Sequence, residues 1–181
     1  MSRNYRLDRL KPDDYRHAFD CGDFDLNEYY LKDSKAACIE YMAVSYALYL
    51  GDEVIAFYCV SNEGLRRDIT TGRRFKRIQK KVKTAEKRYR SMPAVKIGRF
   101  AVSKGQQGDN IGSMLMDAIK RSFVTDNKTG CRFIVVDAYN KSEVIRFYKQ
   151  NGFDFLHDGD KKEDTRIMVF DLVFFADARN A

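Results

Sequence analysis

A short polar stretch from Gln107 to Gly112, "QGDNIG", joins a predicted strand to a predicted helix and is the first candidate for chemistry in this sequence. The leading amides of a helix have no acceptor within the helix and carry a partial positive charge. Gly108 and Gly112 have no side chains to obstruct an anion, and Asn110 tolerates a left-handed backbone better than most residues. The stretch therefore predicts a phosphate-binding turn, with an ordinary strand-to-helix connection of the same composition as the open alternative.

A second candidate lies further along the chain, where another strand leads into another helix. Asn140 occupies the polar link, and the helix carries the adjacent Phe147 and Tyr148 before Gly152. A phenol within reach of a leaving group can donate a proton as a general acid. The alternative is a core aromatic residue beside Phe147, and the residue types alone favour that alternative.

Other common catalytic and metal-binding patterns do not occur in the sequence. The loop lacks the Gly-Lys-Ser/Thr of a Walker motif and the complete glycine pattern of a dinucleotide-binding turn. His17 and His157 have no serine or cysteine partner motif, so a catalytic triad is not expected. Because no cysteines are closely paired, we expect no metal site, and reduced thiols at Cys21, Cys38, Cys59 and Cys131.

Strands and helices must hold these residues in place, and their order follows from hydrophobic periodicity and turn signals. The first half predicts a strand in 4–11, helices in 12–19 and 23–41, and a hairpin of strands 42–50 and 53–62. The second half predicts strand 94–102, helix 111–124, strand 131–139, helix 142–150 stopped by Asn151-Gly152, and strands in 153–157 and 165–175. This order indicates a mixed α/β sheet with helices on both faces.

The composition indicates one folded domain spanning 1–181. Hydrophobic residues make up 44% of the chain and aromatic residues 13%, which supports a sizeable core rather than disorder. No run approaches the roughly 20 apolar residues that cross a bilayer. The charged beginning, "MSRNYRLDRL", has no apolar signal core. We therefore expect a soluble, cytoplasmic protein.

The positive charge of the chain is concentrated in the segment 66–90, a basic and partly helical insert by its pattern. Twelve Lys or Arg stand there against Asp68 and Glu86, a local balance of +10, so the remaining residues sum to −3 within the total of +7. Phe75 and Tyr89 lie among these charges. Such a segment can contact RNA phosphates and stack on bases, and it can equally be a solvated excursion.

Together the two candidate stretches resemble the Gcn5-related N-acetyltransferase (GNAT) superfamily, over a predicted acetyl-CoA-binding core at 94–170. The acetyl-CoA loop of that family reads Gln/Arg-x-x-Gly-x-Gly/Ala, and here Asn110 replaces the central glycine. Its helix signature, Phe-Tyr-x-x-x-Gly-Phe, is matched fully by 147–153. The resemblance implies a GNAT fold: a central mixed, mostly antiparallel sheet of about six or seven strands flanked by helices on both faces.

The resemblance also implies a role for each candidate residue, with acetyl-CoA as acetyl donor and no metal. Main-chain amides of the loop would hold the pyrophosphate, and a strand edge and Asn140 would contact the pantetheine arm. Tyr148 would protonate the departing thiolate. Separately from the resemblance, Glu63 is a candidate base by its position after the second hairpin strand, with water as base and a solvated surface glutamate as the alternative. The implied cofactor-binding residues are Phe100, Ala101, Val102, Gln107, Gly108, Asp109, Asn110, Ile111, Gly112 and Asn140.

A looser resemblance connects the first half to the branch of toxins that acetylate aminoacyl-tRNA. The stretch Phe19-Asp20-Cys21-Gly22 and the Met92-Pro93 before the strand 98–102 match that branch, whereas Asn27 and Tyr30-Leu31 depart from it. The branch implies an aminoacyl-tRNA partner and an antitoxin protein. The charge of 66–90 makes that segment the candidate contact for the tRNA, with a solvated excursion as the open alternative. The sequence leaves the oligomeric state open, with a homodimer as one option.

Three functions remain open on the sequence alone. The first is an N-acetyltransferase that acts on the α-amine of aminoacyl-tRNA, as a toxin would. The second is a GNAT enzyme that acetylates a small-molecule amine, a protein N-terminus or a lysine. The third is a catalytically silent RNA-binding module that retains the fold.

Overall fold

The computed structural model describes residues 4–66, 76, 82 and 90–180, with the backbone alone for 177–180. Most of the basic segment 66–90 lies outside these residues, and so do its predicted partial helix and its RNA contacts. Within the described part of the chain, no helix combines the length and the apolar character needed to cross a bilayer.

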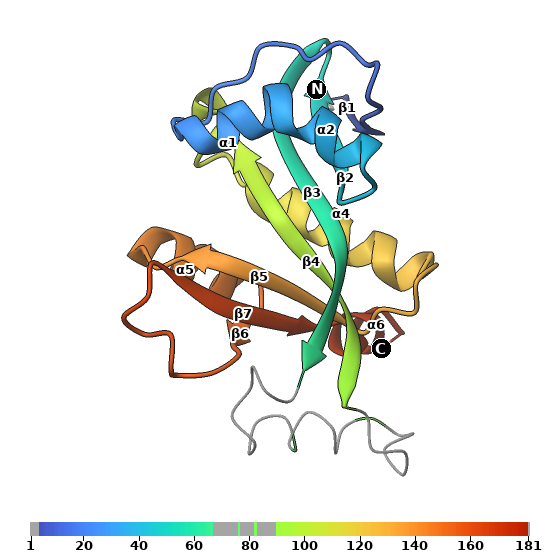
Figure 1. Ribbon diagram of the computed structural model, residues 1–181, viewed down its shortest axis with the longest axis vertical. Coiled ribbons are helices and arrows are strands. Elements are labelled where there is room, and N and C mark those ends of the chain that lie inside the picture. Colours follow the sequence, from blue (N-terminus) through green and yellow to red (C-terminus); the bar gives the residue numbers. More distant parts are fainter. Residues whose placement is uncertain (1–3, 67–75, 77–81, 83–89, 181) are drawn as a thin grey trace. The chain divides into compact units, whose positions relative to one another are not determined.

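Seven strands of the described chain form a sheet in the order β1-β2-β3-β4-β5-β7-β6 (Figure 1). The strands are β1 Tyr5–Arg9, β2 Val44–Leu50, β3 Glu53–Arg66, β4 Ser91–Val102, β5 Phe133–Tyr139, β6 Asp154–Phe155 and β7 Thr165–Asp171. The pairs β1/β2, β2/β3, β5/β7 and β6/β7 are antiparallel. The predicted mixed α/β class, with a mostly antiparallel sheet of six or seven strands, is confirmed.

The helical elements lie between the strands, as predicted, with two exceptions considered below. They are α1 Phe24–Glu28, the π-turn η1 Tyr29–Asp33, α2 Ser34–Ile39, the 3-10 turn η2 Lys104–Gln106, α4 Ile111–Thr125, α5 Ser142–Gln150 and α6 Leu172–Asn180. The first three follow one another without a break, so the helix predicted in 23–41 is confirmed with a π-turn in its middle. The Asp23 side chain caps α1 by accepting a hydrogen bond from the Leu26 amide at 3.1 Å.

The described residues divide into two compact units, and both β3 and β4 have residues in each. The first unit combines the chain up to Ser61 with Ile97–Ala118, and the second combines Asn62–Lys96 with the chain from Ile119 onwards. The single domain predicted for 1–181 stays a prediction.

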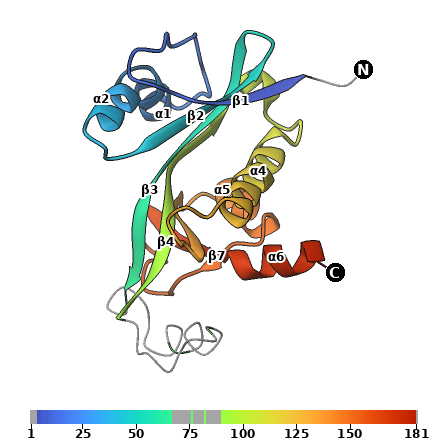
Figure 2. The ribbon, with the colours of Figure 1, turned by 90° about the vertical axis from the view of Figure 1, so that its right-hand side faces the viewer.

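The first unit is built on the β2/β3 hairpin, which turns at Gly51 as predicted, and α2 packs on β2 (Figure 2). Its core is aromatic: the rings of Phe19, Tyr30 and Phe57 lie with centroids 5.2 to 5.3 Å apart. Phe57 and Tyr30 are fully buried. Pairs of this kind add to the stabilisation from burial itself, so this cluster fixes the N-terminal segment on the hairpin.

The second unit is built on β5 and β7, which pair along the whole length of both strands, with α5 packed on β5. Strand β5 is the continuous apolar run of the sequence, and Phe133, Ile134 and Val136 are almost completely buried. This burial on both faces explains why its sequence does not alternate.

The helix predicted in 12–19 is wrong, because this stretch forms turns and irregular structure. The buried guanidinium of Arg16 donates to the carbonyl oxygens of Lys11 and Asp14, both at 3.1 Å, and to Ser34 Oγ at 3.3 Å. A helix would have paired the carbonyl groups of Lys11 and Asp14 with its own amides. A side chain therefore replaces the helical hydrogen bonds.

The strand predicted in 165–175 is only partly confirmed, because β7 ends at Asp171 and α6 begins at Leu172. Asp171 Oδ1 accepts a hydrogen bond from the Val173 amide at 3.2 Å, as an N-cap does. Both carboxylate oxygens of Asp171 also bind Arg132, at 3.0 and 3.1 Å. Asp171 thus marks the end of the strand and the beginning of the helix. Because it lies within an apolar run, the sequence pattern did not indicate this boundary.

The end of α5 depends on a buried lysine. Lys120, 4% exposed, donates from Nζ to the carbonyl oxygen of Asn151 at 2.9 Å, and its charge lies 4.6 Å from the ring centre of Phe170. Asn151 Nδ2 donates back to the Phe147 carbonyl at 2.9 Å, and Gly152 follows at a φ of 79°. The predicted helix stop at Asn151-Gly152 is confirmed.

Replacing Lys120 by Met keeps the apolar stem but removes the donor to Asn151. Because the carbonyl is then buried without this partner, we expect the free energy of unfolding to fall by about 1–3 kcal/mol. Urea denaturation followed by circular dichroism measures this change. Lys128→Met, at a lysine whose side chain is 80% exposed, is the matched control and should change stability by less than about 0.5 kcal/mol. Equal stability of the two variants would contradict the role given to Lys120.

Candidate active site

The candidate residues are divided between the two units. Residues 100–102 and the loop 107–112 belong to the first unit, and Asn140 and Tyr148 belong to the second. The first group lies at the end of β4 and the beginning of α4, and the second lies just after β5 and on α5.

The loop turns sharply before α4, and its backbone has the conformation that the sequence predicts. After η2 the chain passes through Gly108 at a φ of 91° and Asn110 at a φ of 63°. Positive φ is strained for most side chains, but glycine and asparagine accept it. The replacement of the family's central glycine by Asn110 therefore preserves the backbone path.

The amides that open α4 lie ahead of its hydrogen-bond ladder. The Met114 amide donates to the Asn110 carbonyl at 3.0 Å, as the first bond of the helix. The amides of Ile111 and Gly112 precede this bond, where a helix offers no acceptor of its own. Together with the helix dipole, they form an arrangement that can receive a phosphate group.

The side chain of Gln107 braces the loop. Its Nε2 donates to the carbonyl oxygen of Val102 at 3.0 Å and to that of Cys21 at 2.9 Å. Both amide hydrogens are used, so this side chain serves the loop's shape while its backbone stays the part predicted to meet the cofactor. Asp109 is exposed, with its amide donating to Gln106 at 3.4 Å.

Residues 100–102, predicted to pair with the pantetheine arm, form the last part of β4. Ala101 is buried in the first unit's core, while Phe100 and Val102 are half-buried. Directly after them, the Ser103 amide donates to the Ile55 carbonyl of β3 at 2.9 Å, which fixes the end of the strand. The pairing with pantetheine stays a prediction.

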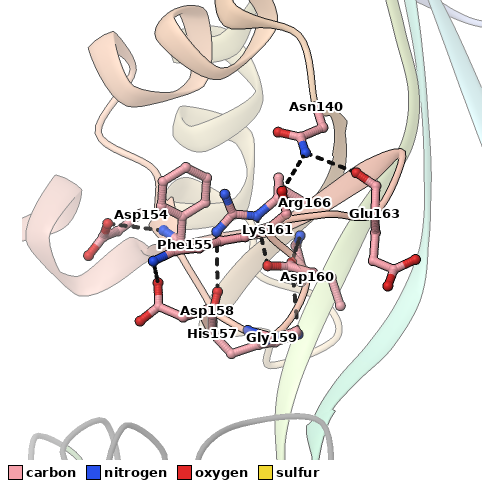
Figure 3. Close-up of polar contacts among 11 residues, drawn as sticks. Asn140, Asp154, Phe155, His157, Asp158, Gly159, Asp160, Lys161, Glu163 and Arg166 are labelled. Carbon is pink, nitrogen blue, oxygen red and sulfur yellow. Dashed lines mark hydrogen bonds and ion pairs between the residues drawn. The ribbon is translucent and has the colours of Figure 1, made fainter.

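Asn140 ties down the loop that leads into β7 (Figure 3). Its Nδ2 donates to the carbonyl oxygens of Lys161 and Glu163 at 3.1 and 2.9 Å. The same loop is held by a buried ion pair, in which Arg166 Nε donates to Asp160 Oδ1 at 2.7 Å. Both amide hydrogens of Asn140 are committed to this loop, so its predicted contact with pantetheine would use Oδ1 and stays a prediction.

Tyr148 lies on α5 with 8% of its surface exposed. Its ring packs edge-on against Phe147 and Phe153, with centroids 5.2 and 5.4 Å away. The Phe153 amide donates to the Tyr148 carbonyl at 3.0 Å, so a hydrogen bond links the two ends of the signature 147–153. Burial raises the pKa of the phenol above its ordinary value. The phenol therefore carries its proton at neutral pH, as it would at its ordinary pKa.

The remaining candidates are less constrained by the structure. Glu63 is exposed, and its Oε1 accepts a hydrogen bond from the Gly64 amide at 2.8 Å, so its role as a base stays a prediction. Among the described residues no group of His, Cys, Asp and Glu could hold a metal ion. All four cysteines are free thiols.

Sequence reasoning missed the residues that hold these groups in place. Asp20 and Lys104 tie the loop to the N-terminal segment, and Lys120 with Asn151 ends the helix that carries Tyr148. The only signal for the first pair was the Phe-Asp-Cys-Gly stretch, whose resemblance gave no role. Nothing in the spacing indicated Lys120, because a lysine on an amphipathic helix is ordinarily exposed.

Known proteins match both the sequence and the fold. A sequence model described as "Acetyltransferase (GNAT) domain" matches residues 46–154, more than half of the chain. Similar solved structures include a tyrosine-to-phenylalanine mutant of KacT, with 23% identity over 96% of this chain and 98% of that one, at a TM-score of 0.78. AtaT complexed with acetyl-methionyl-tRNAfMet has 20% identity over 97% and 99%, at a TM-score of 0.76. AtaTR bound with AcCoA has 19% identity over 97% and 98%, also at 0.76.

These matches confirm the predicted fold and the predicted class of enzyme, an acyltransferase. The matched residues include both candidate stretches, the loop before α4 and the signature on α5. The structural matches cover nearly the whole length of this chain and of the others. The chain belongs to the GNAT family of acetyltransferases.

Proposed function

We propose that this acetyltransferase transfers the acetyl group of acetyl-CoA to the α-amine of an aminoacyl-tRNA. As a member of the GNAT family, the enzyme uses acetyl-CoA as its acetyl donor. The observation that carries the assignment of the reacting residue is the position of Tyr148, buried on the helix that matches the family's signature.

The loop at the start of α4 supplies the binding site for the diphosphate of the cofactor. Gly108 and Asn110 turn the backbone ahead of α4, and the amides of Ile111 and Gly112 precede the first hydrogen bond of the helix. A diphosphate at this place gains hydrogen bonds from main-chain donors that have no partner within the helix. The edge of β4 at 100–102 and Asn140 guide the pantetheine arm.

The chemistry is a direct transfer that needs one acid and one proton acceptor. The neutral amine attacks the thioester carbonyl carbon, the new C–N bond forms, and the C–S bond breaks. Tyr148 gives its phenolic proton to the departing sulfur, and the amine's surplus proton passes to water or to Glu63. The phenolate then regains a proton from solvent, so amine and thioester become amide and thiol without a covalent enzyme species.

Two observations support an aminoacyl-tRNA as the acceptor. The segment 66–90 carries a local charge of +10, enough to attract a polyanion, although most of it lies outside the described residues. AtaT, which shares this fold, has been solved with acetyl-methionyl-tRNAfMet. AtaT has also been solved bound to the C-terminus of the antitoxin AtaR. We therefore propose a protein antitoxin as a further partner of this chain. Because the proposed acceptor and donor are cytoplasmic molecules, we propose the same location for the enzyme.

The first test is the transfer of label from radiolabelled acetyl-CoA to a pool of charged tRNA. We expect label to enter the RNA with wild-type protein, and Tyr148→Phe to slow the transfer by about 10²- to 10⁴-fold because the leaving thiolate loses its proton donor. The affinity for acetyl-CoA, measured by calorimetry, should stay unchanged in this variant.

Tyr41→Phe is the matched control. This substitution also removes a phenolic hydroxyl group, but from a residue that is 95% exposed. This control should retain the wild-type rate. Label that enters a small amine or a protein but never RNA would overturn the proposed acceptor. A Tyr148→Phe variant as active as wild type would overturn the proposed acid.

The pH dependence of the rate distinguishes the acceptor amines. With an amide-linked analogue of an aminoacyl-tRNA end, we expect the rate at limiting acceptor to rise through an apparent pKa of about 8, the usual value of an α-amine. A plateau should follow up to about pH 10, because a phenol with a raised pKa keeps its proton throughout this range. A rate that keeps rising towards about pH 10.4 would indicate a lysine acceptor, and a fall between pH 7 and 9 would contradict the role of Tyr148.

A further inference from the structure

The turn Phe19–Gly22 is bound to the beginning of the acetyl-CoA loop within the first unit, although 84 residues separate the partners. The Lys104 amide donates to the Asp20 carbonyl at 2.9 Å, and Lys104 Nζ donates to Asp20 Oδ2 at 2.9 Å. Further along the loop, Gln107 Nε2 donates to the Cys21 carbonyl at 2.9 Å. Three hydrogen bonds therefore connect this turn to the stretch that precedes the Gly108–Asn110 bend.

The turn is itself held rigid by its own contacts. Asp20 Oδ1 accepts hydrogen bonds from the Gly22 amide at 2.8 Å and from Asn27 Nδ2 at 3.0 Å. Asn27, on α1, also accepts the Cys21 amide at 2.9 Å through Oδ1. Beneath the turn, the ring of Phe19 is buried in the aromatic core. The Asp20 carboxylate is thus held in place by contacts other than the one with Lys104.

The backbone of the turn favours glycine at position 22, where φ is 91°. A Cβ at this position would also lie 2.9 Å from Cε of Lys104, so the lysine stem would have to shift. The lysine stem therefore crosses directly over the glycine to reach Asp20. Each residue of the Phe-Asp-Cys-Gly stretch therefore has a part in the turn. Phe19 is buried in the core, Asp20 binds Lys104, and the Cys21 carbonyl accepts from Gln107. Gly22 adopts the positive φ and leaves room for the lysine stem.

The charge on Asp20 is present at every physiological pH. The hydrogen bond from Lys104, then those from the Gly22 amide and Asn27, lower the pKa of Asp20 from 3.8 to about 2. A lowered carboxyl pKa means that the contribution of the contact is complete above pH 3.8 and disappears as the pH falls through about 2. Protonation of Asp20 therefore does not release its contact with Lys104 under cellular conditions.

We infer that the Phe19–Gly22 turn is a clasp that holds the acetyl-CoA loop in its cofactor-binding geometry, with Asp20 as the positioning residue. The inference rests on the proposed role of the loop in binding acetyl-CoA. A loop that is ordered before binding loses less conformational freedom when the ligand arrives. The clasp therefore raises the affinity for acetyl-CoA without taking part in the transfer step.

The test compares wild-type protein with Asp20→Ala, which removes all three side-chain contacts of the carboxylate. We expect the Kd and the KM for acetyl-CoA to rise about tenfold, while kcat at saturating cofactor and the KM for the acceptor stay within about twofold. Hydrogen exchange of the amides at 108–112 should become faster in the variant. A merely structural role would lower the active fraction and the melting temperature but leave the KM unchanged.

Two further variants sharpen the result. Lys104→Met removes only the ion pair, which is exposed on both sides, and should weaken acetyl-CoA binding by about two- to fivefold. This variant also serves if Asp20→Ala does not fold. Asp25→Ala removes an exposed carboxylate from the neighbouring helix α1 and should leave both the KM and the exchange rates unchanged.

The outcomes separate this inference from the proposed function. If wild-type protein binds no acetyl-CoA in calorimetry, the role of the loop fails, and the clasp fails with it. If wild-type protein binds acetyl-CoA, and Asp20→Ala and Lys104→Met bind it equally well with unchanged exchange, the clasp alone is overturned. A rise in KM with constant kcat in both variants, but not in Asp25→Ala, supports the clasp.

Discussion

Positive φ angles at Gly108 and Asn110 form the turn through which the chain passes from β4 into α4. This turn leads into the first amides of α4, and those amides are what we propose the enzyme offers to a diphosphate. The surrounding contacts preserve the turn: the Ser103 amide holds the end of β4 to β3, and Gln107 fastens the loop to the carbonyl of Val102. The proposed binding surface is therefore made of backbone, and the side chains around it hold the loop in shape.

A similar division of labour holds at α5 in the second unit. Tyr148 is the group proposed to react, but its position depends on residues that have no proposed part in binding or transfer. The Phe153 amide bonds to its carbonyl, and Lys120 and Asn151 end the helix one turn later. The burial that raises the pKa of the phenol follows from the same packing, so the fold that holds the tyrosine also sets its pKa.

Local patterns were sufficient wherever neighbours in sequence determine the structure. The hairpin at Gly51, the helix 142–150 and the positive φ of Asn110 all follow from turn chemistry and periodicity, and all are present. The failures arise where side chains bind main-chain groups or distant residues, which hydrophobic periodicity does not register. Arg16 takes carbonyl groups two and five residues away that a helix at 12–19 would need, and also binds Ser34, 18 residues away. The contact of Asp20 with Lys104 spans 84 residues, so no local pattern could predict it.

The central claim is that main-chain amides ahead of α4 hold the diphosphate of acetyl-CoA. Backbone amide chemical shifts of isotopically labelled protein test it most directly, when titrated separately with coenzyme A and with pantetheine, which lacks the diphosphate. The account predicts that the amide signals of Gly108, Ile111 and Gly112 shift strongly with coenzyme A and stay in place with pantetheine. Signals that stay in place with both ligands, or that move equally with both, would contradict it.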